Sequence, residues 1–303
     1  MECLHPVITP TGVFACGRCT ACLSSRKNSW VTRLQQEYRC SINSIFFTLT
    51  YNDMHTPRMN ALSVTSKTDI QNFMKRLRKL LKITGLRYFI ISEYGPKTLR
   101  PHYHGILFNL PTDLSKINLD VHFPTPRNKI EWLYGITKCI ERAWQKNGEP
   151  MGFVTVDEVT GPRINYVAKY CLAFRLLPHS YRTKEARPFL LSSRKPGIGA
   201  GYITDDIITS HLATGRHHLH YAGTKRSLPR YYSDRIFITE ESREEWRQQV
   251  AYMREKKVLD YLEKYGDYDY KLLLNGVNST MKEQQYQHFV DTVYTKLKKS
   301  GKI

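Results

Sequence analysis

The sequence lacks any apolar run of the length that crosses a membrane. A transmembrane helix needs about 18 consecutive apolar residues, and no segment of the chain provides them. Residues 1–6 have neither the positive start nor the apolar stretch of a secretion signal. We therefore expect no membrane span and no signal peptide.

Cysteine is scarce and unevenly placed. The chain has seven cysteines, an odd number, and four of them lie within the first 22 residues. This distribution argues against a disulfide framework and favours a reducing compartment. The sequence also lacks internal repeats, low-complexity tracts and a GxxxxGK[ST] phosphate-binding loop. The missing loop excludes a helicase domain of the P-loop type within these residues.

Acidic residues are few beside basic ones. Lys and Arg number 46 against 27 Asp and Glu, which gives a formal net charge of +19 and a pI near 9.6. Such a balance indicates a polyanionic partner, and nucleic acid is the first candidate. An acidic membrane surface is the alternative, although no basic amphipathic anchor stands out. Hydrophobic residues make up 41%, enough for a folded core.

Hydrophobic periodicity predicts alternating strands and helices. Strands are expected at 45–51, 86–92, 102–109 and 152–156, and helices at 20–39, 69–83, 130–146 and 163–174. From residue 45 onward the order is β-α-β-β-α-β followed by a helix, which is the split βαβ, ferredoxin-like unit. We expect an α+β fold in which two helices cover one face of a four-stranded antiparallel sheet and the open face is free for a site.

The chain is expected to divide into three parts. Residues 1–25 form a cysteine-rich segment, residues 26–205 contain the sheet, and residues 206–303 form a mainly helical appendage. Two charged helices are expected in the appendage, at 238–264 and 279–300.

Two histidines alternate on the third predicted strand. Residues two apart on a strand share a face, so His102 and His104 project together, with Tyr103 on the other side. The preceding strand ends at Glu93, and the short connection allows a hairpin that brings this carboxylate beside the imidazoles. Such a ligand set suits Mn²⁺ or Mg²⁺ with open positions for a phosphate oxygen. The alternative is two ordinary strand histidines with satisfied hydrogen bonds.

Two tyrosines lie one helical turn apart in the last helix before residue 175. At about 100° per residue, Tyr166 and Tyr170 lie off the apolar stripe formed by Ile164, Val167, Ala168 and Cys171. A phenol can attack a phosphate that a metal has made electrophilic. Lys169 can stabilise a phenolate or hold a phosphate oxygen. Surface tyrosines without a catalytic role are the alternative.

The N-terminal cysteines have the spacing of a metal site. Cys16, Cys19 and Cys22 form a C-x₂-C-x₂-C motif, and Cys3 precedes it. Four thiolates predict a closed structural zinc site. An iron–sulfur cluster or free thiols are the alternatives, and His5 can replace Cys3 as the fourth ligand.

Clusters of cations accompany these motifs. Any of them can contact phosphates, although a charge run is usually a solvated face. The residues concerned are Lys75, Arg76, Arg78, Lys79, Lys82, Arg182, Lys184, Arg187, Arg194 and Lys195.

Together these motifs resemble those of the HUH endonucleases, and more closely those of the replication initiation proteins of gokushovirus-type phages (Microviridae). The matching segments are Cys16–Cys22 with Arg26 and Trp30, Phe47–Tyr51, Glu93–Gly95, His102–Gly105, Tyr166–Tyr170 and Arg194–Gly199. They cover residues 3 to 200, and the last hundred residues add little.

The resemblance implies rolling-circle replication in the cytoplasm of a bacterial host. The protein would nick the viral strand at the origin of the double-stranded replicative form, keep the 5′ phosphate on a tyrosine and free a 3′ hydroxyl for a host DNA polymerase. A second tyrosine would cut the regenerated origin so that the circle can close. By resemblance the nucleophiles are Tyr166 and Tyr170 and the metal ligands His102 and His104. Because a P-loop is absent, unwinding would fall to a host helicase.

Three other functions fit parts of the pattern. The same element order builds RNA-recognition modules, so a non-catalytic binder of single-stranded nucleic acid is the main alternative. A zinc-stabilised transcription regulator would not need the tyrosines. A metal-dependent hydrolase that uses water would cut DNA without a covalent adduct.

Overall fold

The computed structural model describes residues 3, 7–10, 12–95, 98–115, 117, 125–170, 177–221 and 223–265. Contacts divide the chain into two compact units. The sheet unit comprises residues 33–201, and the terminal unit comprises residues 1–32 together with those from 202 onward. Helix α1 (Thr20–Arg39) passes from one unit to the other, so the chain starts in the terminal unit, builds the sheet unit and returns.

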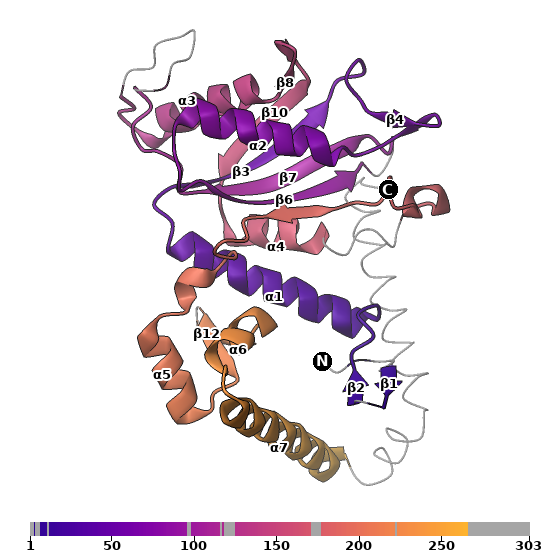
Figure 1. Ribbon diagram of the computed structural model, residues 1–303, viewed down its shortest axis with the longest axis vertical. Helices are drawn as coiled ribbons and strands as arrows, with labels where there is room; N and C mark the ends of the chain where they lie inside the picture. The colour runs from indigo at the N-terminus through magenta and orange to yellow at the C-terminus, as the bar shows by residue number, and fades with distance from the viewer. Residues whose placement is uncertain are drawn as a thin grey trace. The chain divides into compact units, whose positions relative to one another are not determined.

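A five-stranded antiparallel sheet forms the centre of the sheet unit (Figure 1). Its order is β10-β3-β7-β6-β11. The strands are β3 (Ser44–Tyr51), β6 (Arg87–Tyr94), β7 (Pro101–Phe108), β10 (Gly152–Glu158) and β11 (Leu190–Ser192). With helices α2 (Lys67–Leu81) and α3 (Lys129–Ala143), the first four follow the predicted β-α-β-β-α-β order. The prediction of four strands was incomplete, because β11 pairs with β6 and adds a fifth.

Helices α2 and α3 cover one face of this sheet (Figure 1). Ser66 caps α2 by accepting a hydrogen bond from Asp69 N, and Asn128 caps α3 in the same way through Glu131 N. Alternate strand residues point into the core beneath the helices. The strand residues in this core are Ile45, Phe47, Leu49, Tyr51, Ile90, Tyr103 and Leu107.

A hydrogen-bonded network ties α2 to the central strand β7. The Tyr103 hydroxyl accepts from Ser66 N (2.6 Å) and lies 3.0 Å from the Tyr51 hydroxyl, which donates to Asp69 (2.8 Å). Burial raises the pKa of Tyr103, so the phenol stays neutral. The residue between the two histidines is thus fixed in the core, as the alternation predicted.

The second face of the sheet is not open along its whole length, as the prediction had it. Helix α4 (Gly161–Tyr170) lies on this side (Figure 1), and its residues Ile164, Val167 and Ala168 are buried. The half of α1 within the sheet unit also reaches this face, because Glu37 pairs with Arg87 on β6. The predicted apolar stripe of the last helix explains the cover. Residues 171–174 of that predicted helix lie outside the described residues.

Several predicted boundaries shift for identifiable reasons. Helix α3 ends at Ala143 rather than 146, because Asn147 and Gly148 adopt positive φ and turn the chain into a hairpin of β8 (Gln145–Lys146) and β9 (Glu149–Pro150). Strand β6 continues through Glu93 to Tyr94. A further hairpin, β4 (Arg58–Met59) with β5 (Leu62–Ser63), precedes α2.

The loop at 194–199 is held against the sheet by buried ion pairing. Arg87 pairs with Glu37 and donates to the carbonyls of Pro196 and Gly197, each at 2.9 Å. Glu37 also accepts from Gly199 N at 2.6 Å. Arg194 and Lys195 remain exposed beside these anchors. The loop therefore presents its cations from a fixed backbone.

The terminal unit combines short hairpins with helices. An N-terminal hairpin, which the sequence analysis did not predict, precedes α1, and a small core gathers around Leu219, Tyr232, Ile236 and Phe237. Its elements are β1 (Val7–Thr9), β2 (Gly12–Phe14), α5 (Asp205–Thr214), β12 (His218–Tyr221), β13 (Thr224–Ser227), α6 (Arg230–Ile236) and α7 (Glu240–Tyr265), and short 3₁₀ turns occur at His179–Arg182 and Ala200–Tyr202. The predicted charged helix at 238–264 matches α7, and the one at 279–300 lies outside the described residues.

Membrane-spanning helices are absent from the part of the chain that the structure describes, where every helix is too short or too polar to cross a bilayer.

Candidate functional site

The predicted carboxylate and histidines lie next to one another on adjacent strands. Glu93 on β6 is the register partner of His102 on β7, and His104 pairs with Thr48 on β3 at its other side. Cross-strand partners share a face of the sheet, so all four side chains belong to the face opposite α2 and α3. The hairpin inferred from the short connection places Glu93 as expected.

His104 has contacts on both ring nitrogens. Its Nδ1 lies 2.9 Å from Thr48 Oγ1, and its Nε2 lies 3.0 Å from Glu93 Oε2. Glu93 Oε2 nevertheless accepts no hydrogen bond from the described residues, so the second contact has the distance of an ion pair without the alignment of a hydrogen bond. Thr48 therefore fixes the ring, and the Nε2 edge faces the carboxylate.

The buried atoms of this face suit a cation. Glu93 Oε2 and His102 Nδ1 are both buried and have no hydrogen-bond partner among the described residues. Two ligands at right angles on an octahedral Mg²⁺ lie about 3.0 Å apart, since each sits at about 2.1 Å from the ion. The separation of Glu93 Oε2 from His104 Nε2 has that value. The His102 ring centroid lies 6.4 Å from that of His104, so His102 adjoins this pair without closing on it.

Two glycines let the histidines sit where they do. A Cβ on Gly105 would come within 2.5 Å of the Phe47 ring, so only glycine leaves room for that core side chain directly after His104. Gly95 N donates to Arg100 O (2.9 Å) and closes the hairpin, and the His102 ring lies over Gly95. The His-Gly dipeptide thus has a packing cause.

Tyr166 reaches this face from α4. Its ring lies 5.2 Å from the His104 ring in an edge-to-face contact and 6.3 Å from Phe46, which itself stacks on His104 at 6.0 Å. The prediction that this tyrosine turns away from the apolar stripe of its helix is consistent with its half-buried position. Lys169 is exposed on the same helix. Helix α4 ends at Tyr170, whose side chain lies outside the described part of the structure.

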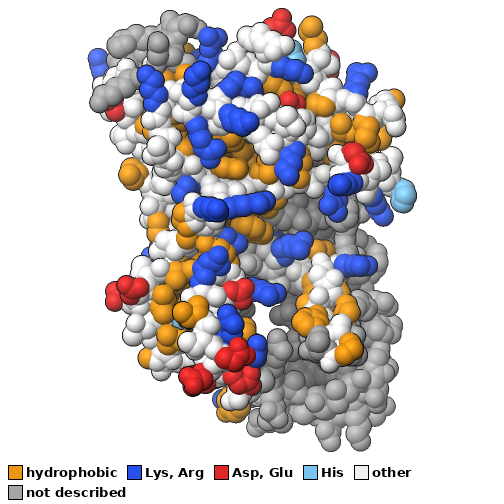
Figure 2. All heavy atoms as spheres, viewed as in Figure 1, with side chains coloured by type: hydrophobic (Ala, Val, Ile, Leu, Met, Phe, Trp, Pro, Cys, Tyr) orange, Lys and Arg blue, Asp and Glu red, His pale blue; other side chains and the backbone are white. Residues whose placement is uncertain are grey.

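The predicted basic residues have mixed surroundings. Figure 2 shows Lys and Arg side chains spread over the viewed face of the sheet unit. Among them, Arg76 donates to Ala143 O at the end of α3 (2.8 Å), and Arg78 lies over the Tyr88 ring. These two therefore have structural roles. The exposed members of the predicted set are Lys75, Lys79, Lys82, Arg182, Lys184, Arg187, Arg194 and Lys195.

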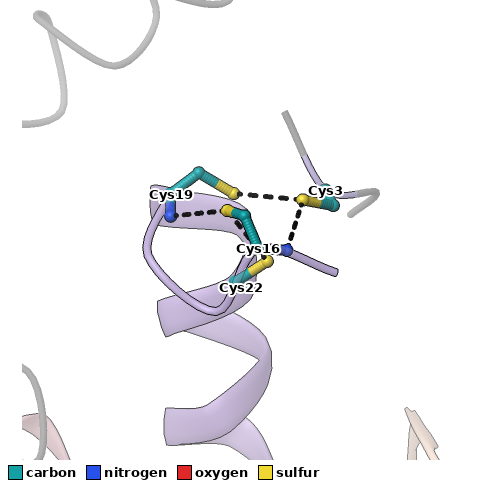
Figure 3. A group of neighbouring side chains, drawn as sticks. All are labelled: Cys3, Cys16, Cys19 and Cys22. Atoms are coloured by element: carbon teal, nitrogen blue, oxygen red, sulfur yellow. Dashed lines mark hydrogen bonds between the residues drawn. The ribbon is translucent and has the colours of Figure 1, made fainter. Parts of the chain in front are cut away.

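The four N-terminal cysteines converge (Figure 3). Their sulfur atoms all lie within 4.8 Å of one another, and the Cys16–Cys22 and Cys3–Cys19 pairs are each 3.9 Å apart. The edge of a tetrahedral zinc–sulfur site is about 3.8 Å. The cluster can therefore hold a metal ion. His5, the alternative ligand, lies outside the described residues.

Backbone geometry activates one of these thiols. Gly17 adopts φ +68°, and the turn it makes aims the amides of Arg18 and Cys19 at Cys16 Sγ (3.4 and 3.3 Å). These hydrogen bonds lower the pKa of Cys16 to about 6, whereas burial raises the pKa of Cys22 to about 12. Four such close thiols ionise together only when a cation balances them.

Sequence reasoning missed three features of the molecule. Thr48 and Phe46, which contact His104, lie on β3, and only the strand register reveals them as its neighbours. The third is a second His-x-His pair, His218 and His220 on β12. Its spacing is visible in the sequence and is the signal that was available.

The fold and site define a class. The protein is an α+β protein whose antiparallel sheet presents two histidines beside a carboxylate and below a helix-borne tyrosine, accompanied by a four-cysteine cluster that can bind metal.

Comparison with known proteins places the chain within a family. Residues 44–174 match the Replication-associated protein ORF2 family. The chain is 30% identical over 251 residues to the Replication-associated protein ORF2 of Spiroplasma virus 4, an alignment that covers 80% of this chain and 72% of that protein. The chain therefore belongs to this family of replication-associated proteins, and the predicted relationship to small-phage replication proteins is confirmed.

More distant relatives cover less of the chain. The Replication-associated protein VP4 of Bdellovibrio phage phiMH2K is 28% identical over 229 residues, which is 73% of this chain and 66% of that protein. The Replication-associated protein ORF4 of Chlamydia phage 1 is 26% identical over 167 residues, which is 51% of this chain and 37% of that protein. No solved structure matches the chain.

Proposed function

We propose that this replication-associated protein is a metal-dependent DNA nicking and joining enzyme of the HUH type that starts rolling-circle replication. The observation that carries the proposal is the edge-to-face contact of Tyr166 with His104, at 5.2 Å, on the face that also holds Glu93. A candidate nucleophile and candidate metal ligands from separate elements thus meet at one place. The order of the four central strands, β10-β3-β7-β6, also supports a ferredoxin-like core.

The chain's own residues orient the reacting groups. Thr48 holds the His104 ring, and the hairpin holds Glu93 and His102 on the same face. A Mn²⁺ or Mg²⁺ ion held by Glu93, His102 and His104 would polarise a phosphate oxygen and stabilise the charge that develops on it. Lys169 adds a positive charge to the helix that carries the tyrosines.

The proposed step is a transesterification. The phenolic oxygen of Tyr166 or Tyr170 attacks the phosphorus, the bond from phosphorus to the 3′ oxygen breaks, and the phenolic proton ends on the released 3′ hydroxyl. The 5′ phosphate remains esterified to tyrosine, so no water is consumed and the step can be reversed for joining. Two tyrosines allow a second cleavage while the first still carries DNA.

The remaining assignments follow from this function. The DNA partner is the viral strand at the origin of the replicative form, and unwinding and synthesis belong to a host helicase and polymerase in the bacterial cytoplasm. The HUH domain spans residues 26–205, between a zinc-bound segment at 1–25 and the helical region at 206–303. Cys3, Cys16, Cys19 and Cys22 hold the structural zinc, which native mass spectrometry would detect as one ion per chain, lost in Cys16→Ser.

A covalent adduct tests the nicking chemistry. The protein is mixed with Mn²⁺ and single-stranded oligonucleotides that tile the phage genome, and the products are separated on denaturing gels. We expect a shifted protein–DNA band that is weakened in Tyr166→Phe or Tyr170→Phe, absent from the double variant and absent with EDTA. Tyr134→Phe, on exposed α3, is the matched control.

Two outcomes would overturn the proposal. A band that persists in the double variant would remove the tyrosines from the reaction. Cut DNA without any adduct would indicate a hydrolase that uses water.

A further inference from the structure

Phe153 is a large aromatic side chain exposed at the edge of the sheet. It lies on β10, the outermost strand beside β3, and 68% of its surface is accessible. A single exposed apolar residue is ordinary on protein surfaces. Its position relative to the candidate site must therefore carry any argument.

The strand register places Phe153 in line with the metal ligands. Phe153 pairs with Thr50 on β3, Thr50 pairs with His102 on β7, and His102 pairs with Glu93 on β6. These four residues form one row across four strands and share one face of the sheet. Because adjacent strands are about 4.8 Å apart, Phe153 lies two strands, about 10 Å, from His102.

The core fixes this register. The neighbours of Phe153 on β10, Val154 and Val156, pack against the hydrophobic core on the other face. A slip by one residue would exchange the two faces and expose both valines while burying Phe153. Phe153 is thus held on the site face by the packing of its neighbours. Thr155, which follows on the same face, is also exposed.

We infer that Phe153 is a base-stacking platform for single-stranded DNA that crosses the sheet from the histidines toward β10. The inference rests on the proposed function, in which a DNA phosphate sits at Glu93 and His104. A strand held there has bases within a few nucleotides that reach the open edge of the face. Aromatic rings stack on bases whatever the sequence, and the net charge of +19 suits the backbone.

Binding without chemistry tests the inference. Anisotropy of a labelled single-stranded oligo-dT is measured with the full chain in EDTA, at one fixed salt concentration. Loss of one stacked base weakens binding by about five- to hundred-fold, and we expect this loss in both Phe153→Ala and Phe153→Leu. Phe153→Trp restores wild-type affinity, because its ring stacks as well. Leucine separates stacking from simple apolar contact.

Tyr134→Ala is the matched control. Tyr134 is also an exposed aromatic side chain, 59% accessible, but it lies on α3 at the other face of the sheet. We expect its removal to leave oligo-dT affinity within twofold of wild type. Because Phe153 is exposed, its variants should keep the wild-type melting temperature.

Three outcomes would overturn the inference. They are unchanged affinity in Phe153→Ala, equal loss in Tyr134→Ala, or a dimer in solution that Phe153→Ala dissociates, which would make β10 a contact between two copies. The nicking proposal is tested separately. An adduct that forms normally beside unchanged oligo-dT binding in Phe153→Ala refutes the platform alone, whereas Phe153-dependent binding without any adduct refutes the nicking chemistry.

Discussion

Two His-x-His pairs occupy strands in this protein, and their surroundings differ in charge. His102 and His104 on β7 lie beside Glu93, the cross-strand partner of His102. His218 and His220 on β12 lie in the terminal unit, with ring centroids 5.1 Å apart, and the cross-strand partner of His220 is Lys225. Equivalent positions in the two hairpins thus carry a carboxylate in one case and an ammonium in the other.

The difference affects what each pair can bind. Burial first, and then the charges of Lys225, His217, His220 and Arg216, lower the pKa of His218 to about 4. Groups that repel a proton also repel a metal cation. The carboxylate beside the first pair has the opposite effect. Spacing alone therefore places two imidazoles on one face, and the residue across the strand decides whether a cation is welcome there.

The largest expected effect separates the two pairs by function. His104→Ala should reduce adduct formation about a hundred- to thousand-fold, the range for removing one group that stabilises developing charge. His218→Ala should stay within twofold of wild type. Adduct yields at equal protein concentration measure both, and equal losses would contradict the assignment of the site to β7.

A smaller effect tests how the first pair is oriented. Thr48→Val removes the hydroxyl 2.9 Å from His104 Nδ1 while keeping the side-chain shape. Loss of such a supporting hydrogen bond weakens metal affinity about ten- to hundred-fold. Thr48→Ser, which keeps the hydroxyl, should bind like wild type. Calorimetric titration with Mn²⁺ measures this without DNA, and a valine variant with wild-type affinity would exclude a positioning role.

The charge difference can be reversed in the second pair. Lys225→Glu places a carboxylate opposite His220, the relation that Glu93 has to His102. Exchanging a surface cation for an anion changes the local interaction by about 1–2 kcal/mol, so Ni²⁺ affinity of the hairpin should rise about tenfold. The double variant Lys225→Glu/His220→Ala should lose the gain. No gain in the single variant would show that charge is not the deciding difference.

The smallest effect is a dependence on pH. Because the folded pKa of His218, about 4, lies below the ordinary value of 6.5, the unfolded chain binds more protons between these pH values. The stability that neutral His218 contributes is present above pH 6.5 and is lost as the pH falls toward 4. His218→Gln should therefore lose less thermal stability between pH 7 and pH 5 than wild type. Melting curves across that range measure it, and parallel losses would remove His218 as the cause.

The regular elements of the sheet unit were predictable because their patterns are local. Strand β3 and helix α1 match the predicted ranges to within a residue, since alternation and helical periodicity are read along the chain. The edge strand β11 was missed because it is only three residues long and is stabilised by pairing with β6. The two-residue turn at Asn147-Gly148 was present in the sequence and outweighed the helical periodicity that runs on to residue 146.

The candidate site divides in the same way. The sharing of a face by His102 and His104 follows from spacing, and Glu93 followed from the length of the hairpin connection. The contact of His104 with Thr48 could not be predicted, because it depends on how β3 pairs with β7 across more than fifty residues. The approach of Tyr166 likewise depends on how α4 packs onto the sheet.

The sequence by itself determined which residue types alternate, which strand carries the paired imidazoles and where four thiols can meet, because these follow from periodicity and short spacing. Only the tertiary structure decided which side chains lie beside them. Pairing between distant strands put Glu93 and Thr48 on either side of His104, and put Lys225 opposite His220. Since the field at each histidine falls off within a few ångström, those neighbours, rather than the motif, determine whether a pair attracts or repels a cation.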